Sequence, residues 1–220
     1  MSVLCDWEIR SLCDSHQMIW PFSPELLNPA SLDVRLGHKL MIEVSDRKSL
    51  ITIDISDRTE EDPYLLTPGE FVLAETIETF NLPDDISAQF VLKSSRAREG
   101  FTHALAGWVD PGFNNSKLTL ELKNQRRYHG LYLYPNLKIG QLVFFQMNST
   151  PAISYAVTGR YNGHGSVMPS ADEKTNDVSV KKSIVEGRIV YLCVTSEEVK
   201  LFYCREDAQE CALKMTRVMP

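Results

Sequence analysis

The sequence predicts an all-β protein in which short strands form a meander or a barrel. Segments between residues 89 and 146 are rich in β-branched, aromatic or leucine residues, the types favoured in strands. Asp-Pro-Gly, Asn-Asn-Ser, Tyr-Pro-Asn and Ile-Gly turns separate these segments and leave no room for a long helix. The predicted strands cover residues 89–93, 106–109, 117–123, 130–134 and 141–146.

Further elements are expected on either side of this region. Residues 6–15 carry apolar residues at helical spacing and predict a short helix with Asp6 as its N-cap. Four more strands are predicted, over residues 31–37, 39–44, 50–55 and 71–74. The end of the chain predicts a β-hairpin and a helix, over residues 187–195, 199–204 and 205–217.

These elements divide the chain into a main domain, residues 1–170, and an extension, residues 171–220. The extension begins with the largely polar residues 171–180, which are expected to form a linker. Residues 155–170 end the main domain with the glycine-rich run Gly-Arg-Tyr-Asn-Gly-His-Gly-Ser, which composition alone would class as a flexible segment. The extension is expected either to add packing or to bind a partner.

The composition is that of a globular protein and excludes several classes of function. The chain has 220 residues, 43% hydrophobic and 24% charged, so it can bury a core. A net charge of -6 argues against general binding of DNA or RNA, which requires a basic face, whereas a free nucleotide needs only a local cluster. No signal peptide and no run of 18 apolar residues is found, so we expect a cytoplasmic protein with no membrane segment.

The five cysteines also restrict the chemistry. Their number is odd and no C-x-x-C pair occurs, which disfavours disulfides and a structural zinc site. The zinc deaminases carry H-x-E followed by P-C-x-x-C, and this signature is missing too. A zinc-dependent reaction is therefore not expected.

Residue types that perform chemistry are concentrated between residues 93 and 145. In Leu-Thr-Leu-Glu-Leu, residues 118–122, the leucines share one face of a strand and Glu121 projects from the other. Asp110 begins an Asp-Pro-Gly-Phe turn that would hold it at a strand end. A cluster of cations and hydroxyls suited to phosphate comprises Lys93, Ser94, Ser95, Arg96 and Arg98. Taken alone, Asp110 and Glu121 are more often a turn cap and a solvated strand residue.

Four motifs in this region resemble those of the dCTP deaminases, in the same order. Residues 93–98 are similar to KSSLAR, 106–113 to AGWIDPGF, 118–124 to ITLELxN and 138–145 to KIGQLVFF. Near the start, residues 4–9 resemble LSDRDI and residues 28–37 resemble QPASYDLRLG. The resemblance covers roughly residues 1–170 and leaves the extension unaccounted for.

The resemblance implies a distorted jelly-roll of the dUTPase-like type and a homotrimer with nucleotide sites between subunits. The implied reaction is the hydrolytic deamination of dCTP to dUTP and ammonia, which supplies dUTP for thymidylate synthesis. Water would be activated without zinc. Mg²⁺ would enter with the triphosphate and bridge phosphate oxygens rather than occupy a protein cage.

The resemblance also implies roles for individual residues. Glu121 would be the general base that takes a proton from water and passes it to ring N3. Ser94, Arg98 and the backbone at Ala106 would position and polarise the water. The residues implied to contact substrate are Lys93, Ser95, Trp108, Val109, Gln141, Arg160, Tyr161 and His164. The last three lie in the arm, residues 155–170, which folds over the nucleotide in trimeric relatives.

Two alternatives to a dUTP-forming deaminase stay open. One is a bifunctional dCTP deaminase and dUTP diphosphatase, which gives dUMP and pyrophosphate and uses Asp110 to help activate a second water. The glycine at position 107 resembles the bifunctional branch of the family in this respect. The other is a catalytically weak, nucleotide-binding regulatory protein whose extension binds a partner.

Departures from the family pattern keep the regulatory alternative open. Leu105 stands where the family has threonine, and His164 stands where it has glutamine. The spacing from Arg98 to Ala106 is one residue short, which blurs the alignment of His103 more than that of Glu121. Outside these motifs, Arg35 lies on the polar face of the predicted strand 31–37, and its role is expected to be structural.

Overall fold

A computed structural model describes residues 2–45, 48–170, 179–185, 188–194 and 199–202. The chain forms two units. The first comprises Met1–Glu43 and Leu50–Ala171, and the second comprises Val44–Ser49 and Asp172–Pro220.

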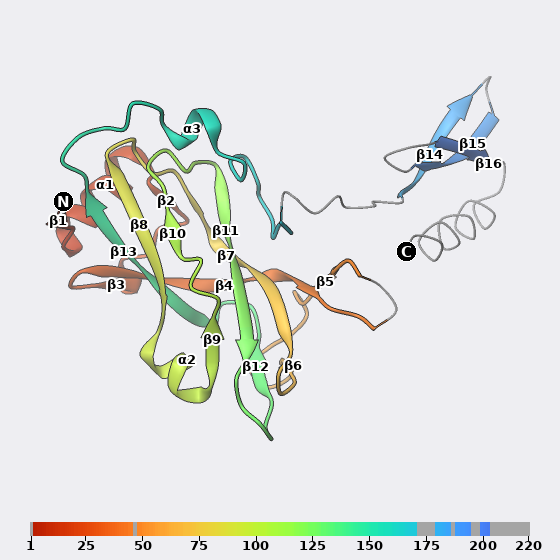
Figure 1. Cartoon of the computed structure of the whole chain (residues 1–220), viewed down its shortest axis with the longest axis horizontal. Coiled ribbons are helices and arrows are strands. Elements are labelled where there is room, and N and C mark those ends of the chain that lie inside the picture. The colour runs from red at the N-terminus through yellow and green to blue at the C-terminus, as the bar shows by residue number, and fades with distance from the viewer. Residues whose placement is uncertain (1, 46–47, 171–178, 186–187, 195–198, 203–220) are drawn as a thin grey trace. The chain divides into compact units, whose positions relative to one another are not determined.

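The first unit is built around a curled antiparallel sheet of eleven strands (Figure 1). Its main path runs β10-β8-β13-β4-β7-β11-β9; β1 pairs with β13, β2 with β7, and both β3 and β5 with β4. The strands are β1 (Ser2–Val3), β2 (Ile19–Trp20), β3 (Leu27–Asn28), β4 (Ser31–Ile42), β5 (Ile51–Asp54), β7 (Phe71–Phe80), β8 (Ile86–Leu92), β9 (Phe101–His103), β10 (Trp108–Val109), β11 (Ser116–Asn124) and β13 (Lys138–Gln146). A separate two-stranded sheet comprises β6 (Tyr64–Leu66) and β12 (Leu131–Leu133). This architecture confirms the predicted all-β fold.

The long strand β4 joins the two halves of the sheet. Residues 32–35 of β4 pair with β13, whereas residues 36–42 pair with β7. Where the partner changes, residues 37–39 lie opposite the single residue Glu75. They form a bulge rather than a turn, so the two strands predicted over 31–37 and 39–44 are one continuous strand.

The core fills the inside of the curled sheet. Apolar residues at alternate strand positions point inward, as the period of two requires. Fully buried examples are Leu32, Val34, Leu36, Leu40, Val72, Ala74, Leu122, Ile139 and Phe144. On β11 the buried Leu120 and Leu122 flank Glu121, which lies on the opposite face and confirms the predicted alternation.

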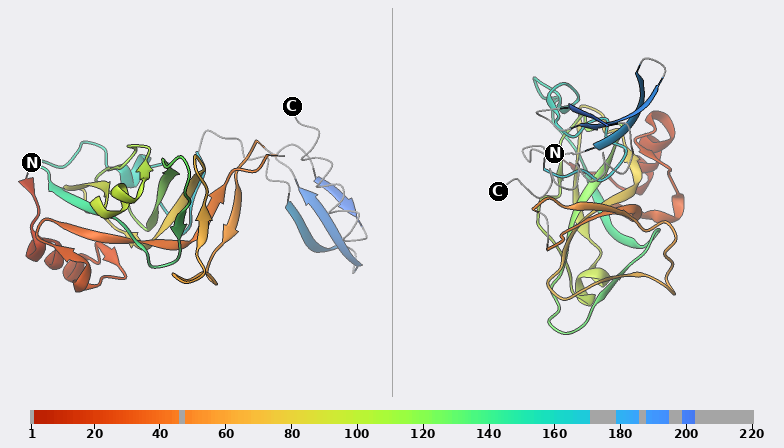
Figure 2. Two further views of the ribbon diagram at one scale, coloured as in Figure 1. Left: turned by 90° about the horizontal axis from the view of Figure 1, so that it is seen from below. Right: turned by 90° about the vertical axis from the view of Figure 1, so that its right-hand side faces the viewer.

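Three short helices and a 3₁₀ turn complete this unit. α1 (Asp6–His16) confirms the predicted N-terminal helix and packs beside β4 (Figure 2). Its N-cap is Cys5 rather than Asp6, because the Glu8 carboxylate accepts a hydrogen bond from the Cys5 backbone N–H at 2.9 Å. The others are α2 (Ser94–Glu99), α3 (Tyr155–Thr158) and the 3₁₀ turn η1 (Pro24–Leu26). In Figure 1, α2 lies at one end of the barrel with the β6–β12 ribbon, and α3 lies at the other end.

Most predicted strands are confirmed, although their bounds differ. β8, β11, β12, β13 and β5 contain most of the residues predicted over 89–93, 117–123, 130–134, 141–146 and 50–55. The strand predicted over 71–74 continues to Phe80, and the one predicted over 106–109 shortens to β10. β6, β9 and α2 were not predicted, because three to six residues carry too little periodicity to detect.

The second unit contains an antiparallel three-stranded sheet in the order β14-β15-β16. Its strands are β14 (Ser179–Val185), β15 (Arg188–Val194) and β16 (Val199–Phe202). The pairing of β15 with β16 confirms the predicted hairpin, and β14 is a third strand that the sequence did not predict. The predicted helix over 205–217 and residues 171–178 of the predicted linker lie outside the described residues, whereas residues 179 and 180 of that linker belong to β14.

The ion pair between Arg35 of β4 and Glu78 of β7 is expected to stabilise the contact between these two strands. Glu78 has no exposed side-chain surface, and it accepts hydrogen bonds from Arg35 Nε at 2.7 Å and from the Arg35 backbone N–H at 3.0 Å. Removing one member of a buried ion pair leaves the other uncompensated. We expect Arg35→Met to lower the free energy of unfolding by about 3 kcal/mol, measured by chemical denaturation.

Arg58→Met is the matched control for this prediction. Arg58 meets Asp62 at 3.0 Å in an exposed pair, and its loss should cost less than about 0.5 kcal/mol. Equal effects of the two substitutions would contradict a structural role for the Arg35–Glu78 pair.

Candidate active site

Glu121 lies on β11, which pairs with β7 along one edge and with β9 along the other. On one side Glu121 lies opposite Leu73 of β7, and on the other Leu122 lies opposite His103 of β9. Because Leu120 and Leu122 face the core, Glu121 faces the other way, and a quarter of its side chain is exposed. The carboxylate is thus aimed by a regular strand in the interior of the sheet.

His103 lies beside this carboxylate. Its Nε2 lies 2.9 Å from Glu121 Oε2, and its side chain is 7% exposed. The ring packs against Phe90, with the two centroids 4.8 Å apart. The Ala104 backbone N–H also donates to the Glu121 carbonyl at 3.2 Å, which ties the end of β9 to β11.

The close approach of His103 and Glu121 is not aligned as a hydrogen bond. Within the described part of the chain, neither Nε2 nor Oε2 makes an aligned hydrogen bond to any group, although both atoms are buried. Buried polar atoms normally have a partner, and the exceptions need a specific explanation. A water or a substrate group that contacts both atoms from the side would give each a partner, and a general base must lie within hydrogen-bond reach of the proton that it takes.

The loop that follows β9 lies close to the neighbouring strand β8. The Gly107 carbonyl accepts a hydrogen bond from the Phe90 backbone N–H at 2.7 Å, and a Cβ at Gly107 would stand 2.5 Å from the Phe90 carbonyl oxygen. Only glycine fits this close approach. Leu105 has a φ of 65° and is 95% exposed, and Ala106 is exposed beside it. The loop therefore packs its backbone against β8.

Asp110 occupies a second setting, at the end of β10. The Phe113 backbone N–H donates to the Asp110 carbonyl at 3.2 Å, which confirms the predicted Asp-Pro-Gly-Phe turn. Trp108 Nε1 donates to Asp110 Oδ1 at 3.0 Å, and the indole stacks on Phe145 with centroids 5.8 Å apart. The carboxylate is exposed but held in one orientation by an aromatic side chain.

The basic and hydroxyl cluster forms the start of α2. Ser94, Ser95 and Arg98 are exposed on this helix. Lys93 precedes them as N-cap, and its Nζ lies 2.5 Å from the buried carboxylate of Asp33. In the described residues, no hydrogen bond or ion pair joins Ser94 or Arg98 to Glu121.

Two residues implied to contact substrate are engaged elsewhere. The Val109 side chain is buried in the core, because alternation along β10 turns Trp108 outward and Val109 inward. Val109 therefore offers no side-chain contact to a ligand. Gln141 on β13 accepts a hydrogen bond from Ser31 Oγ at 2.9 Å.

The arm, residues 155–170, packs along the sheet. α3 begins at the Asp-Pro-Gly-Phe turn, where the Tyr155 backbone N–H donates to the Pro111 carbonyl at 3.1 Å. Further along, the Tyr161 carbonyl accepts from Ser116 Oγ at 2.9 Å, and the His164 carbonyl accepts from the Lys117 backbone N–H at 3.0 Å. The arm is thus attached to the first residues of β11.

Sequence reasoning assigned no role to His103. Its signal was the Phe-Thr-His alternation of a short strand, and the link to Glu121 needed the pairing of β9 with β11. In the described residues, no group of three or more His, Cys, Asp or Glu side chains is placed to hold a metal ion. Among the same residues, no helix is long and apolar enough to cross a membrane.

Comparison with known proteins gives a consistent result. The family described as dCTP deaminase-like matches residues 3–147. The dUMP-forming dCTP deaminase of Corynebacterium kroppenstedtii is 39% identical over 179 residues, which is 73% of this chain and 92% of that protein. The enzyme of the same name from Nocardioides sp. is 41% identical over 162 residues, 68% of this chain and 84% of that protein.

A solved structure supports the fold. The 2'-deoxycytidine 5'-triphosphate deaminase from Agrobacterium tumefaciens matches with a TM-score of 0.53 and 21% identity, over 64% of this chain. This chain spans about half of that protein's length, since 47% of that chain is covered. At this identity the likeness concerns the fold alone.

The close packing of Gly107 provides a test of the loop beside Glu121. Gly107→Ala would place a methyl group against the Phe90 carbonyl and should lower the free energy of unfolding by about 1–3 kcal/mol, measured by chemical denaturation. Gly165→Ala is the control, because no atom lies within 4 Å of a Cβ at that position. Equal stability of the two variants would show that the loop does not press on β8.

Proposed function

The chain belongs to the dCTP deaminase-like family, and from that premise we propose that it converts dCTP to dUMP, ammonia and pyrophosphate. One water replaces the amino group at C4, and a second cleaves the bond between the α- and β-phosphates. The relatives' name, dUMP-forming, favours this alternative over a reaction that stops at dUTP. The observation that carries the proposal is a pair of carboxylates in different settings, Glu121 against His103 and Asp110 held by Trp108.

In the first step Glu121 acts as general base. Its carboxylate takes a proton from the water that attacks C4, and it passes that proton to ring N3. The proton of the new C4 hydroxyl is then transferred to the amino group, and ammonia leaves as the C4 carbonyl forms. The partly buried His103 ring lies beside the carboxylate and packs against Phe90.

Three further groups are proposed to act on the same water. Ser94 and Arg98 would position it, and the backbone at Ala106 would polarise it, because donors fixed before the reaction stabilise charge that develops in the transition state. All three groups are exposed. Because the described residues show no hydrogen bond or ion pair from Ser94 or Arg98 to Glu121 within one chain, we propose that α2 of one copy lies against Glu121 of another, in a homotrimer.

In the second step Asp110 helps to activate water for attack at the α-phosphate. The indole N–H of Trp108 holds one oxygen of this exposed carboxylate. Mg²⁺ is proposed to arrive with the triphosphate, and a single exposed carboxylate beside phosphate oxygens suits its preference for few protein ligands. When bound, the ion would neutralise charge on the phosphates.

The products of the reaction test the proposal directly. Purified protein is incubated with dCTP, dUTP or dCMP in the presence of Mg²⁺, and the products are separated by chromatography. We expect dUMP and pyrophosphate from dCTP. Accumulation of dUTP alone would indicate a deaminase without diphosphatase activity, and no turnover with retained binding would favour a regulatory nucleotide-binding protein.

Glu121→Gln is expected to abolish deamination while preserving the fold. General acid–base catalysis contributes roughly 10² to 10⁴ in rate, and dUMP formation from dCTP should fall by that factor. Nucleotide affinity, measured by calorimetry, should stay within about twofold of wild type, because the amide has the same shape. Lys123→Gln, at an exposed position of the same strand, is the control and should leave the rate unchanged. Wild-type turnover by Glu121→Gln would eliminate this residue as the base.

Asp110→Asn is expected to separate the two steps. Deamination should continue, because the amide still accepts from Trp108, whereas cleavage of the triphosphate should slow by roughly 10²-fold or more. Chromatography of the dCTP reaction should then show dUTP in place of dUMP. If dUMP still forms at the wild-type rate, Asp110 is only a turn residue.

A further inference from the structure

The segment Glu75 to Glu78 of β7 lies between two irregular ladders. On the β4 side, residues 37–39 face Glu75 alone; on the β11 side, residues 76–78 face Leu118 alone. Such bulges leave backbone N–H groups without a ladder partner. Side chains of this segment accept them: Thr76 Oγ1 from the Leu118 N–H at 3.0 Å, and Glu75 Oε1 from the His38 N–H at 3.4 Å.

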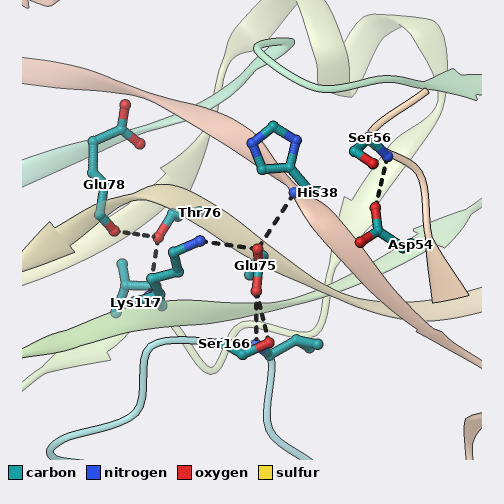
Figure 3. A network of polar contacts seen from close by, with 10 residues as sticks. His38, Asp54, Ser56, Glu75, Thr76, Glu78, Lys117 and Ser166 are labelled. Carbon is teal, nitrogen blue, oxygen red and sulfur yellow. Dashed lines mark hydrogen bonds and ion pairs between the residues drawn. The ribbon is translucent and has the colours of Figure 1, made fainter. Parts of the chain in front are cut away.

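Besides the His38 N–H, the two carboxylate oxygens of Glu75 have further hydrogen-bond partners (Figure 3). The residue is 2% exposed. Lys117 Nζ lies 2.9 Å from Oε1, while Ser166 Oγ and the Val167 backbone N–H each donate to Oε2 at 3.0 Å. Gly37 makes room for this side chain, since a Cβ there would stand 2.5 Å from Glu75 Cγ.

The surroundings keep this buried carboxyl ionised at neutral pH. Burial alone would raise the pKa of Glu75, but the hydrogen bond and charge of Lys117, with the donors Ser166 and Val167, lower it below its ordinary value of 4.5. A group with a lowered folded pKa contributes stability above its unfolded pKa, and this contribution is lost as the pH falls through the folded value. At neutral pH the carboxylate is a strong acceptor for both donors of the arm.

The residues held by Glu75 belong to the arm, ninety positions later in the chain. β9 pairs with β11 only at residues 122–124, so the arm occupies the free edge beside residues 116–119. The His164 backbone N–H donates to Ser116 Oγ at 3.2 Å, and the Met168 N–H donates to Thr119 Oγ1 at 3.1 Å. Val167 is buried in a small apolar cluster with Met41 and Leu73.

A buried ion pair is not by itself evidence of function, since apolar residues can often replace one without loss of stability. Here Lys117 accounts for only one oxygen of Glu75. The other oxygen is occupied by two donors from the arm, which carries Arg160, Tyr161 and His164. Glu75 is therefore placed to control the arm, whereas the hydrogen bonds that the described residues show for Glu78, three residues along the same strand, join it to Arg35 and Thr76.

We propose that Glu75 is a positioning residue for nucleotide binding: it fixes residues 164–168 to the barrel, so that His164 meets the nucleotide from a rigid segment rather than from a mobile arm. The proposal rests on the proposed function for the identity of the ligand, and on the family resemblance for the contact between the arm and that ligand. It makes Glu75 a determinant of substrate affinity and not of the chemical step, because the carboxylate contacts the arm and not Glu121.

Hydrogen exchange of the arm in the absence of nucleotide provides the first test. Glu75→Gln keeps the shape of the side chain but loses the charge and presents an amide to Lys117 and Val167. Loss of a hydrogen bond to a charged group should accelerate amide exchange at Val167 and Met168 by about tenfold or more. Glu78→Gln is the matched control and should leave exchange in the arm unchanged. Ser166→Ala, which removes one arm donor without touching the core, should give a smaller acceleration at the same amides.

Steady-state kinetics with dCTP provide the second test. We expect Glu75→Gln to raise KM about tenfold with kcat within about twofold of wild type, and Glu78→Gln to change neither by more than about twofold. Replacing Lys117 as well, in Glu75→Gln/Lys117→Met, removes the unpaired ammonium and should recover part of the lost affinity.

The outcomes separate this proposal from the proposed reaction. If wild type binds dCTP without turnover, the reaction is wrong, and the dCTP dissociation constant replaces KM in the same comparison. If exchange at Val167 and Met168 is the same in Glu75→Gln and wild type, or if kcat falls while KM is constant, Glu75 is not a positioning residue. Equal acceleration in Glu78→Gln would likewise reduce Glu75 to a general contributor to stability.

Discussion

Three buried polar side chains of β7 hold the sheet together where its backbone ladders are interrupted. Glu75, Thr76 and Glu78 accept N–H groups that the bulges leave unpaired, and the two carboxylates also take cations from β4 and β11. Buried polar groups are tolerated only when their hydrogen-bonding capacity is met. These bonds stabilise the packing of β4 and β11 against β7 where the ladders are irregular.

The two candidate carboxylates differ in what surrounds them. Glu121 leaves a regular strand beside a buried imidazole, and its Oε2 has no aligned hydrogen bond within the described residues. Asp110 leaves a turn, is exposed, and is oriented by the indole of Trp108. Two carboxylates held at different places in the fold can contact two different waters.

The first residues of β11 connect these sites to the arm. Ser116, Lys117 and Thr119 each bond to arm residues between Tyr161 and Met168, and Glu121 follows two positions after Thr119. The same strand therefore carries the proposed base and the attachment of the segment proposed to contact the nucleotide. A substrate that engages both would be held by one rigid element, which favours precise orientation.

By itself the sequence determined the all-β fold, the inward leucines around Glu121, the turn at Asp110 and the resemblance that names the substrate class. These are local properties, because strand periodicity and turn chemistry act over a few residues. Only the tertiary structure decided that His103 lies against Glu121, that Lys93 meets Asp33, that Val109 is buried, and that Glu75 holds Ser166 and Val167. Each of these depends on register between strands distant in the chain, and a shift of one residue would turn every side chain to the opposite face.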